Sequence, residues 1–149
     1  MSISPDKPRS ARVVRAEVTE APISVTELAG AVQDAAAGAV VTFEGVVRNH
    51  DADRGVSGIG YSCHPTAGQI VKEIARDVAE RGRVRALGVV HRVGDLAVGE
   101  AALAVAVSSD HRAEAFATCG EIVEEVKKRL PVWKRQTFSD GTSQWSNLA

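Results

Sequence analysis

Apolar residues along the chain fall into two patterns, short β-branched runs and longer runs spaced by three or four positions. In the short runs, Val, Ile and Thr either alternate with polar residues or follow one another without interruption. These two forms are typical of strands buried on one face or on both. The predicted strands cover residues 12–19, 39–48, 56–63, 84–93, 101–108 and 132–138.

The longer spacing predicts three helices. Ser24, with Glu27 three positions later, has the form of a capping box, and Gly38 is the candidate stop for this first helix. Ile70 and Ile74 lie on one face of the second helix, and Pro131 ends the third. The predicted helices cover residues 24–38, 65–82 and 110–130.

The order of these elements predicts an α+β domain. Strands and helices follow one another as β-α-β-β-α-β-β-α-β-β, and the final hairpin turns at Asp140-Gly141. This order lacks the regular alternation of a doubly wound fold and indicates a mixed or antiparallel sheet. Residues 1–10 are rich in Ser, Pro and basic residues, so we expect a disordered N-terminal extension and one domain over residues 11–149.

Composition narrows the class of protein. A chain of 149 residues can bury about two-thirds of its surface, which suits one domain. The net charge of −1 argues against a protein that coats nucleic acid. The longest apolar run, residues 101–107, is far shorter than the roughly 18 residues of a membrane span. No secretory signal is recognisable and the two cysteines form no C-x-x-C, so we expect a cytoplasmic protein.

The first candidate for chemistry lies where a strand gives way to a helix, at Ser108-Ser109-Asp110-His111-Arg112. Cations in a first helical turn oppose the helix dipole, yet together with free N–H groups they form a good anion site. A simpler explanation is that Ser109 or Asp110 caps the helix while Arg112 points into water. The residues alone leave both explanations open.

Two further candidates are cationic. Arg48 stands at the polar end of a long apolar strand, where it could also be an ordinary edge residue paired with a carboxylate. Five cations then lie within residues 127–135, and those that end the third helix could simply be a solvated cap. Lys127 differs from Lys128 because it follows Val123 by one helical turn and so borders the apolar face. Partial loss of hydration there would suit acid–base or nucleophilic work.

Other chemistries find little support. Cys119 lies in the middle of a helix and is expected to be core rather than a nucleophile. No metal-ligand spacing, P-loop or nucleophile elbow is present. The candidates together describe a small anion-binding enzyme built from cations, without a metal, a cofactor or a catalytic thiol.

Five segments carry a resemblance to a known family. They are GAVVTFEGVVRNH (38–50), VVHRVGDLAVGE (89–100), VAVSSDHRAEAF (105–116), KKRLPVWKRQ (127–136) and DGTSQW (140–145). In order and spacing, from about residue 25 to residue 145, the chain resembles the catalytic, larger subunit of molybdopterin synthase. The resemblance implies an α/β hammerhead-like fold with an added antiparallel β subdomain.

The resemblance also implies a function. Members of this family transfer sulfur from the C-terminal thiocarboxylate of a small ubiquitin-like subunit to cyclic pyranopterin monophosphate, which forms the dithiolene of molybdopterin. The small subunit's Gly-Gly tail enters the catalytic subunit. The expected assembly is a heterotetramer, in which a homodimer of the catalytic subunit carries one small subunit at each end.

Site residues follow from the same resemblance. Lys127 and Lys134 match the family's catalytic and second pocket lysines. Arg48, His111 and Arg112 match its anion-binding positions, and we expect them to hold the phosphate together. Val46 stands where many members carry a basic residue, so its contact is expected through the backbone. The substrate-binding set implied is Val46, Val47, Arg48, His111, Arg112, Lys127, Lys134, Arg135 and Gln136.

Two alternatives remain at this stage. One is a non-catalytic dimeric module that binds a ubiquitin-like tail or an anionic ligand. The presence of both Lys127 and Lys134 argues against it, because a module without chemistry does not need them. The other is a lysine-dependent Schiff-base enzyme.

Overall fold

The computed structural model describes residues 10–81 and 83–148. The predicted disordered extension, residues 1–10, therefore lies outside the described residues except for Ser10. The elements are β1 (Arg12–Thr19), α1 (Val25–Ala31), β2 (Ala39–Val46), β3 (His50–Asp51), β4 (Arg54–Cys63), α2 (Ala67–Glu80), β5 (Ala86–Arg92), β6 (Gly94–Ala97), β7 (Ala101–Ser109), α3 (Arg112–Arg129), β8 (Val132–Phe138) and β9 (Ser143–Asn147).

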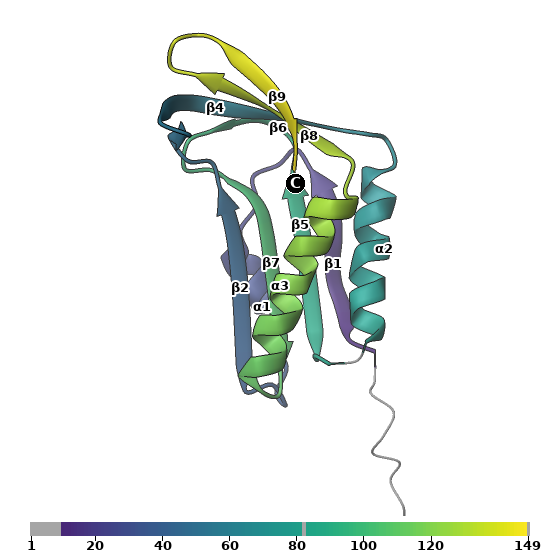
Figure 1. Cartoon of the computed structure of the whole chain (residues 1–149). Helices are drawn as coiled ribbons and strands as arrows, with labels where there is room; N and C mark the ends of the chain where they lie inside the picture. Colours follow the sequence, from purple (N-terminus) through teal and green to yellow (C-terminus); the bar gives the residue numbers. More distant parts are fainter. Residues whose placement is uncertain (1–9, 82, 149) are drawn as a thin grey trace, which may run out of the picture.

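The first sheet has the strand order β1-β5-β7-β2. Strand β1 runs parallel to β5, while β5 with β7 and β7 with β2 are antiparallel, so the sheet is mixed. Helices α2 and α3 cover one face and α1 covers the other (Figure 1). Because both faces are covered, β5 and β7 are buried over nearly their whole length and read as continuous apolar runs.

The hydrophobic core is divided by the first sheet into two clusters, one on each face. The larger apolar cluster lies beneath α2 and α3 and includes Ile74, Ile122 and Val126. A smaller cluster around Leu28 and Val32 lies beneath α1. Aromatic residues are only 4% of the chain, so aliphatic side chains fill both clusters almost alone.

The second sheet lies at one end of the first (Figure 1). Strand β4 pairs with β6 along one edge and with β8 along the other, and β8 continues to β9. The two-residue strand β3 pairs with the start of β4. All these pairings are antiparallel, which confirms the predicted α+β fold with an added antiparallel subdomain.

The structure differs from the predicted elements at three places. Helix α1 ends at Ala31 rather than at Gly38, and it is followed by a turn in which Asp34 Oδ1 accepts a hydrogen bond from the Ala36 N–H. Residues 94–99, which lie between two predicted strands, contain a further strand, β6, which pairs with β4. Residues 49–55, for which no element was predicted, contain β3 and the start of β4, which form a hairpin. None of the described helices is long and apolar enough to cross a membrane.

Candidate functional site

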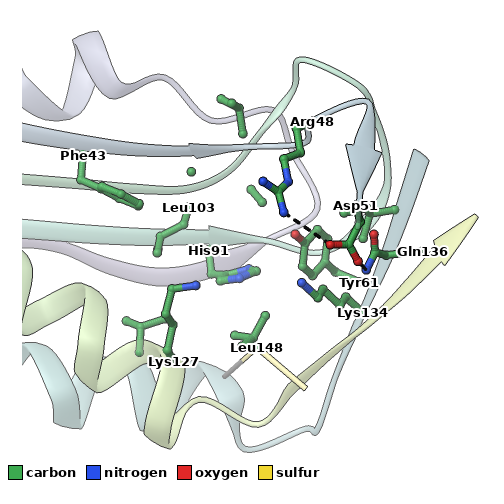
Figure 2. A pocket seen from close by; sticks show the side chains of 15 residues that line it. Phe43, Arg48, Asp51, Tyr61, His91, Leu103, Lys127, Lys134, Gln136 and Leu148 are labelled. Carbon is green, nitrogen blue, oxygen red and sulfur yellow. Dashed lines mark hydrogen bonds and ion pairs between the residues drawn. The ribbon is translucent and has the colours of Figure 1, made fainter. Parts of the chain in front are cut away.

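A cavity of about 200 Å³ lies where the first sheet, the second sheet and the end of α3 meet. Figure 2 shows it from close by. The residues that line it come from seven different elements and the segments beside them, so only the complete fold assembles it. They are Phe43, Gly45, Val46, Arg48, Asp51, Ile59, Tyr61, His91, Ala102, Leu103, Val126, Lys127, Lys134, Gln136 and Leu148.

Three cations of the predicted set line this cavity. Arg48 follows the end of β2, Lys134 lies on β8, and Lys127 lies in the last turn of α3. Val123 and Val126 are buried against the sheet, and this orientation of the helix brings Lys127 to the cavity. Lys128 does not line the cavity, as its position on the helix predicts.

One carboxylate stands among the cations. Arg48 Nη2 donates to Asp51 Oδ1 over 3.4 Å, and Gln136 Nε2 donates to Asp51 Oδ2 over 3.0 Å. Gln136 is only 8% exposed, whereas the Arg48 side chain is 66% exposed. Asp51 therefore orients two predicted substrate contacts from one side of the cavity.

Two uncharged ring side chains, Tyr61 and His91, also line the cavity. The rings of Tyr61 and His91 meet edge to face, with centroids 5.3 Å apart. Burial raises the pKa of the Tyr61 hydroxyl. Burial, with a smaller contribution from the charge of Lys127, lowers the pKa of His91 to about 4. Both side chains are therefore uncharged at neutral pH.

The other residues predicted near Arg48 and Lys134 differ in their positions. Val46 lines the cavity, but Val47 is buried in a small apolar cluster with Leu96. Arg135 is not among the lining residues: its Nε donates to Ser143 Oγ over 3.1 Å, and its guanidinium lies 5.9 Å from the Trp145 ring centroid. Neighbours on β8 alternate in direction, which explains why Lys134 and Gln136 reach the cavity and Arg135 does not.

His111 and Arg112 lie elsewhere. They border a separate shallow depression at the start of α3, beside Gly38 and Asp110. From Arg112 to Lys127 the helix rises about 22 Å, so one chain cannot place Arg112 and Lys127 on one small ligand. The expectation that His111 and Arg112 join Arg48 around one phosphate is therefore not met within a single chain.

Helix α3 also begins differently from the predicted capping. Its N-cap is His111, with no side-chain capping bond, rather than Ser109 or Asp110. The Asp110 carboxylate instead accepts hydrogen bonds from Arg85 Nε and Nη2 over 2.6 and 3.0 Å. This pairing lowers the pKa of Asp110.

Neither cysteine lies at the cavity. Cys63 is exposed at the end of β4, and Cys119 lies on the buried face of α3, where burial raises the pKa of its thiol to about 11. Within residues 10–81 and 83–148, no group of three or more His, Cys, Asp and Glu side chains could hold a metal ion. The polar side chains that line the cavity are its three cations, the Asp51 carboxylate, the Gln136 amide and the neutral rings of Tyr61 and His91.

Sequence reasoning missed Asp51, Tyr61 and His91 as parts of the site. For His91 a signal existed, since it directly follows the apolar run Leu87–Val90 within a predicted strand. A buried histidine at the end of an inner strand is unusual enough to examine. Asp51 carried no such signal, because it stands in a polar segment.

Comparison with known proteins identifies the family of this chain. A family model described as MoaE protein matches residues 18–129. The molybdopterin synthase catalytic subunit of Aspergillus clavatus is 37% identical over 133 residues, 89% of this chain and 67% of that protein. The protein of the same name from Nostoc is 35% identical, over 88% of this chain and 81% of its own length.

Solved structures give the same result. The crystal structure of molybdopterin synthase from Staphylococcus aureus aligns with a TM-score of 0.81 at 28% identity, over 89% of this chain and 96% of that one. The MoaE protein from Burkholderia ambifaria aligns with a TM-score of 0.74 at 25% identity, over 93% and 90%. The chain therefore belongs to the molybdopterin synthase catalytic subunit family and has a role in molybdopterin biosynthesis.

Proposed function

We propose that this chain transfers sulfur from the C-terminal thiocarboxylate of a small ubiquitin-like subunit to cyclic pyranopterin monophosphate. The observation that carries the proposal is the convergence of Arg48, Lys127 and Lys134 on one cavity without a cysteine in its lining. Each transfer exchanges one sulfur for one oxygen. On the substrate a carbon–sulfur bond forms and a carbon–oxygen bond breaks, while the carrier loses its carbon–sulfur bond, gains one oxygen and ends as an ordinary carboxylate. Two transfers make the dithiolene.

The cavity suits the charge and shape of these reactants. A cyclic phosphate and a thiocarboxylate are both anions, and charge-assisted hydrogen bonds from Arg and Lys are the strong way to hold them. Phe43 and Tyr61 offer aromatic surface for a flat pterin ring. Gln136 and Asp51 supply the polar contacts that fix the orientation of a ligand.

The position of the cysteines supports an external sulfur donor. Cys119 is 4% exposed and lies in the core, while Cys63 is exposed but does not line the cavity. Sulfur must then arrive on another molecule. A related fold from Helicobacter pylori, 18% identical with a TM-score of 0.65, is described as a complex of subunits 1 and 2 of molybdopterin-converting factor. We therefore expect a small subunit as partner here.

Lys127 is assigned the proton transfer. It stands at the C-terminal end of α3, at the edge of the cavity. As an ammonium group it can donate a proton to the oxygen that leaves the substrate, and as an amine it can take one back. Positioned acid–base groups of this kind contribute about 10²–10⁴-fold in rate. Arg48 and Lys134 are assigned to binding.

The proposal includes a homodimer in which each copy supplies His111 and Arg112 to the other's cavity. The separation along α3 supports this arrangement, because one chain cannot bring both ends of its helix to one ligand. Strand β2 is one of the two edge strands of the first sheet and exposes Val40 and Val46. It begins beside Ser109 and ends at the cavity, so antiparallel apposition of two β2 edges would exchange the two ends.

Reconstitution tests the function directly. The purified chain is mixed with the precursor and with the small subunit, either thiocarboxylated or as the plain carboxylate. We expect dithiolene to form with the thiocarboxylate alone. Tight binding of both carrier forms without any dithiolene would contradict the proposal and favour the non-catalytic binding module.

A further inference from the structure

His91 is a buried titratable group in the cavity wall to which the proposed function assigns no role. It lies on β5, is 2% exposed, and lines the cavity. In the sheet it pairs with Val18 of β1 on one side and Leu103 of β7 on the other. A buried polar ring normally has hydrogen-bond partners that explain its presence.

One ring nitrogen has such a partner. His91 Nδ1 lies 2.7 Å from the carbonyl oxygen of Arg92. A carbonyl oxygen can only accept, so Nδ1 carries the hydrogen. In a neutral imidazole the other nitrogen, Nε2, then carries a lone pair and can only accept. Among the described residues, Nε2 has no hydrogen-bond partner.

Few charged or titratable groups surround this free lone pair. From β4 comes Tyr61, whose ring contacts the imidazole edge to face. From α3 comes Lys127, whose charge lowers the pKa of His91, and Figure 2 shows its amine directed toward the imidazole. Figure 2 also shows Arg48, Asp51 and Lys134 grouped on the other side of the ring. Of the cations that line the cavity, Lys127 is therefore the donor directed at this side of the ring.

We propose that His91 is a positioning residue, whose Nε2 accepts a hydrogen bond from the Lys127 ammonium group and fixes where that group stands in the cavity. The catalytic meaning of this contact rests on the proposed function. A charged imidazole could not do it, because it would repel the ammonium group. Burial of the ring supplies the required neutral state.

NMR spectroscopy of the full chain tests the contact without any substrate. Side-chain ¹⁵N shifts of His91 are recorded against pH in the wild-type chain, in Lys127→Met and in Lys128→Met as the matched control. We expect the Nδ1–H tautomer, and we expect the pKa of His91 to rise in Lys127→Met but not in Lys128→Met. An Nε2–H tautomer would overturn the inference, and so would a pKa of His91 that is the same in Lys127→Met and in the wild-type chain.

Two His91 variants test the consequence for turnover. His91→Asn can still donate to the Arg92 carbonyl but has no atom at the Nε2 position, whereas His91→Gln extends an acceptor toward it. We expect His91→Asn to lower kcat about 10- to 100-fold at unchanged KM, and His91→Gln to recover most of the loss.

Equal losses in both variants would overturn the inference, since packing alone would then explain the ring. If the wild-type chain itself transfers no sulfur, the proposed function fails. The NMR comparison still decides, independently of that result, whether His91 holds Lys127.

Discussion

Gln136 donates a hydrogen bond to Asp51 over 3.0 Å and so ties β8 to the short strand β3 across 85 positions of sequence. The other oxygen of Asp51 accepts from Arg48 over 3.4 Å. The carboxylate thus orients two groups that are expected to meet the substrate. It also places a negative charge in a cavity that is expected to bind anions.

Replacing Asp51 separates these two effects. In Asp51→Asn the amide oxygen can still accept from Gln136, but the charge is gone. We expect pyrophosphate to bind about three to ten times more tightly, because the loss of a nearby like charge is worth on the order of 1 kcal/mol. Isothermal titration calorimetry measures this. Asp53→Asn, in the exposed turn, is the control, and equal affinities in the two variants would contradict the expectation.

Substitutions of Arg112 and Lys127 should change different kinetic constants. If Arg112 holds the phosphate in ground and transition states alike, Arg112→Ala mainly raises KM. Lys127→Ala should lower kcat about 10²–10⁴-fold, as expected for a lost acid–base group. Lys127→Arg should stay slow, because arginine keeps its proton. Single-turnover sulfur transfer measures all three, with Lys128→Ala as control; near-normal rates in Lys127→Arg would remove the acid–base role.

The cysteines should be dispensable for turnover. The Cys63→Ser, Cys119→Ala double variant should keep most of its sulfur transfer, apart from a loss of stability from the smaller core side chain at position 119. In the native wild-type chain, a thiol reagent should modify Cys63 alone, since Cys119 is buried and its thiol has a pKa of about 11. Turnover that disappears while the circular dichroism spectrum is unchanged would contradict delivery of sulfur by the partner.

The free energy of unfolding should fall as the pH drops from about 6.5 to 4, because His91 stays neutral in the folded chain over this range. Its pKa is about 4 in the folded chain, against 6.5 for an ordinary histidine, so the unfolded chain binds the proton first. The contribution of the neutral His91 ring to the free energy of unfolding is complete above pH 6.5 and declines by up to about 3 kcal/mol toward pH 4. Urea unfolding at pH 7 and pH 4.5 measures the decline. His91→Phe should show a smaller one, and equal declines would contradict the assignment.

Substitutions of Gly88 and Gly30 by alanine should change the stability of the fold in opposite directions. At Gly88 an added Cβ would lie 2.6 Å from Leu28 Cδ1 and 3.1 Å from Val14 Cγ2, and Leu28 is buried with no room to withdraw. Gly88→Ala should therefore cost about 1–3 kcal/mol. At Gly30, in α1, a Cβ meets nothing within 4 Å, so Gly30→Ala should stabilise by about 0.5–1 kcal/mol. Thermal unfolding of both variants tests the packing beneath α1.

Local signals predicted local structure well. The Ser24–Glu27 capping signal marks the true start of α1, and the Ser24 side chain accepts from the Glu27 N–H as expected. The helical position of Lys127 correctly separated it from Lys128. In both cases the deciding interactions lie within one or two turns of the chain. Gly38 was wrong as the stop, because the helix ends at Ala31 and a turn at Asp34, in which the Asp34 side chain accepts from the Ala36 N–H, follows it.

Relationships between distant elements could not be predicted in this way. His91 and Lys127 line the same cavity only because the end of α3 lies beside the first sheet, and Asp51 meets Gln136 only because β8 returns beside β4. His111 and Arg112 have the residue types of an anion site, but their distance from Arg48 depends on the length of α3 and on where β2 lies. Such distances are properties of the assembled sheet rather than of any short segment.

The length of α3 has a genetic consequence. If two copies share each site, an Arg112→Ala chain and a Lys127→Ala chain are defective at opposite ends of the same helix. In a mixed dimer one site combines both defects, while the other receives an intact Lys127 from one copy and an intact Arg112 from the other. At substrate concentrations well below the raised KM, the two defective alleles expressed together would then complement each other, and random pairing would restore about a quarter of wild-type activity.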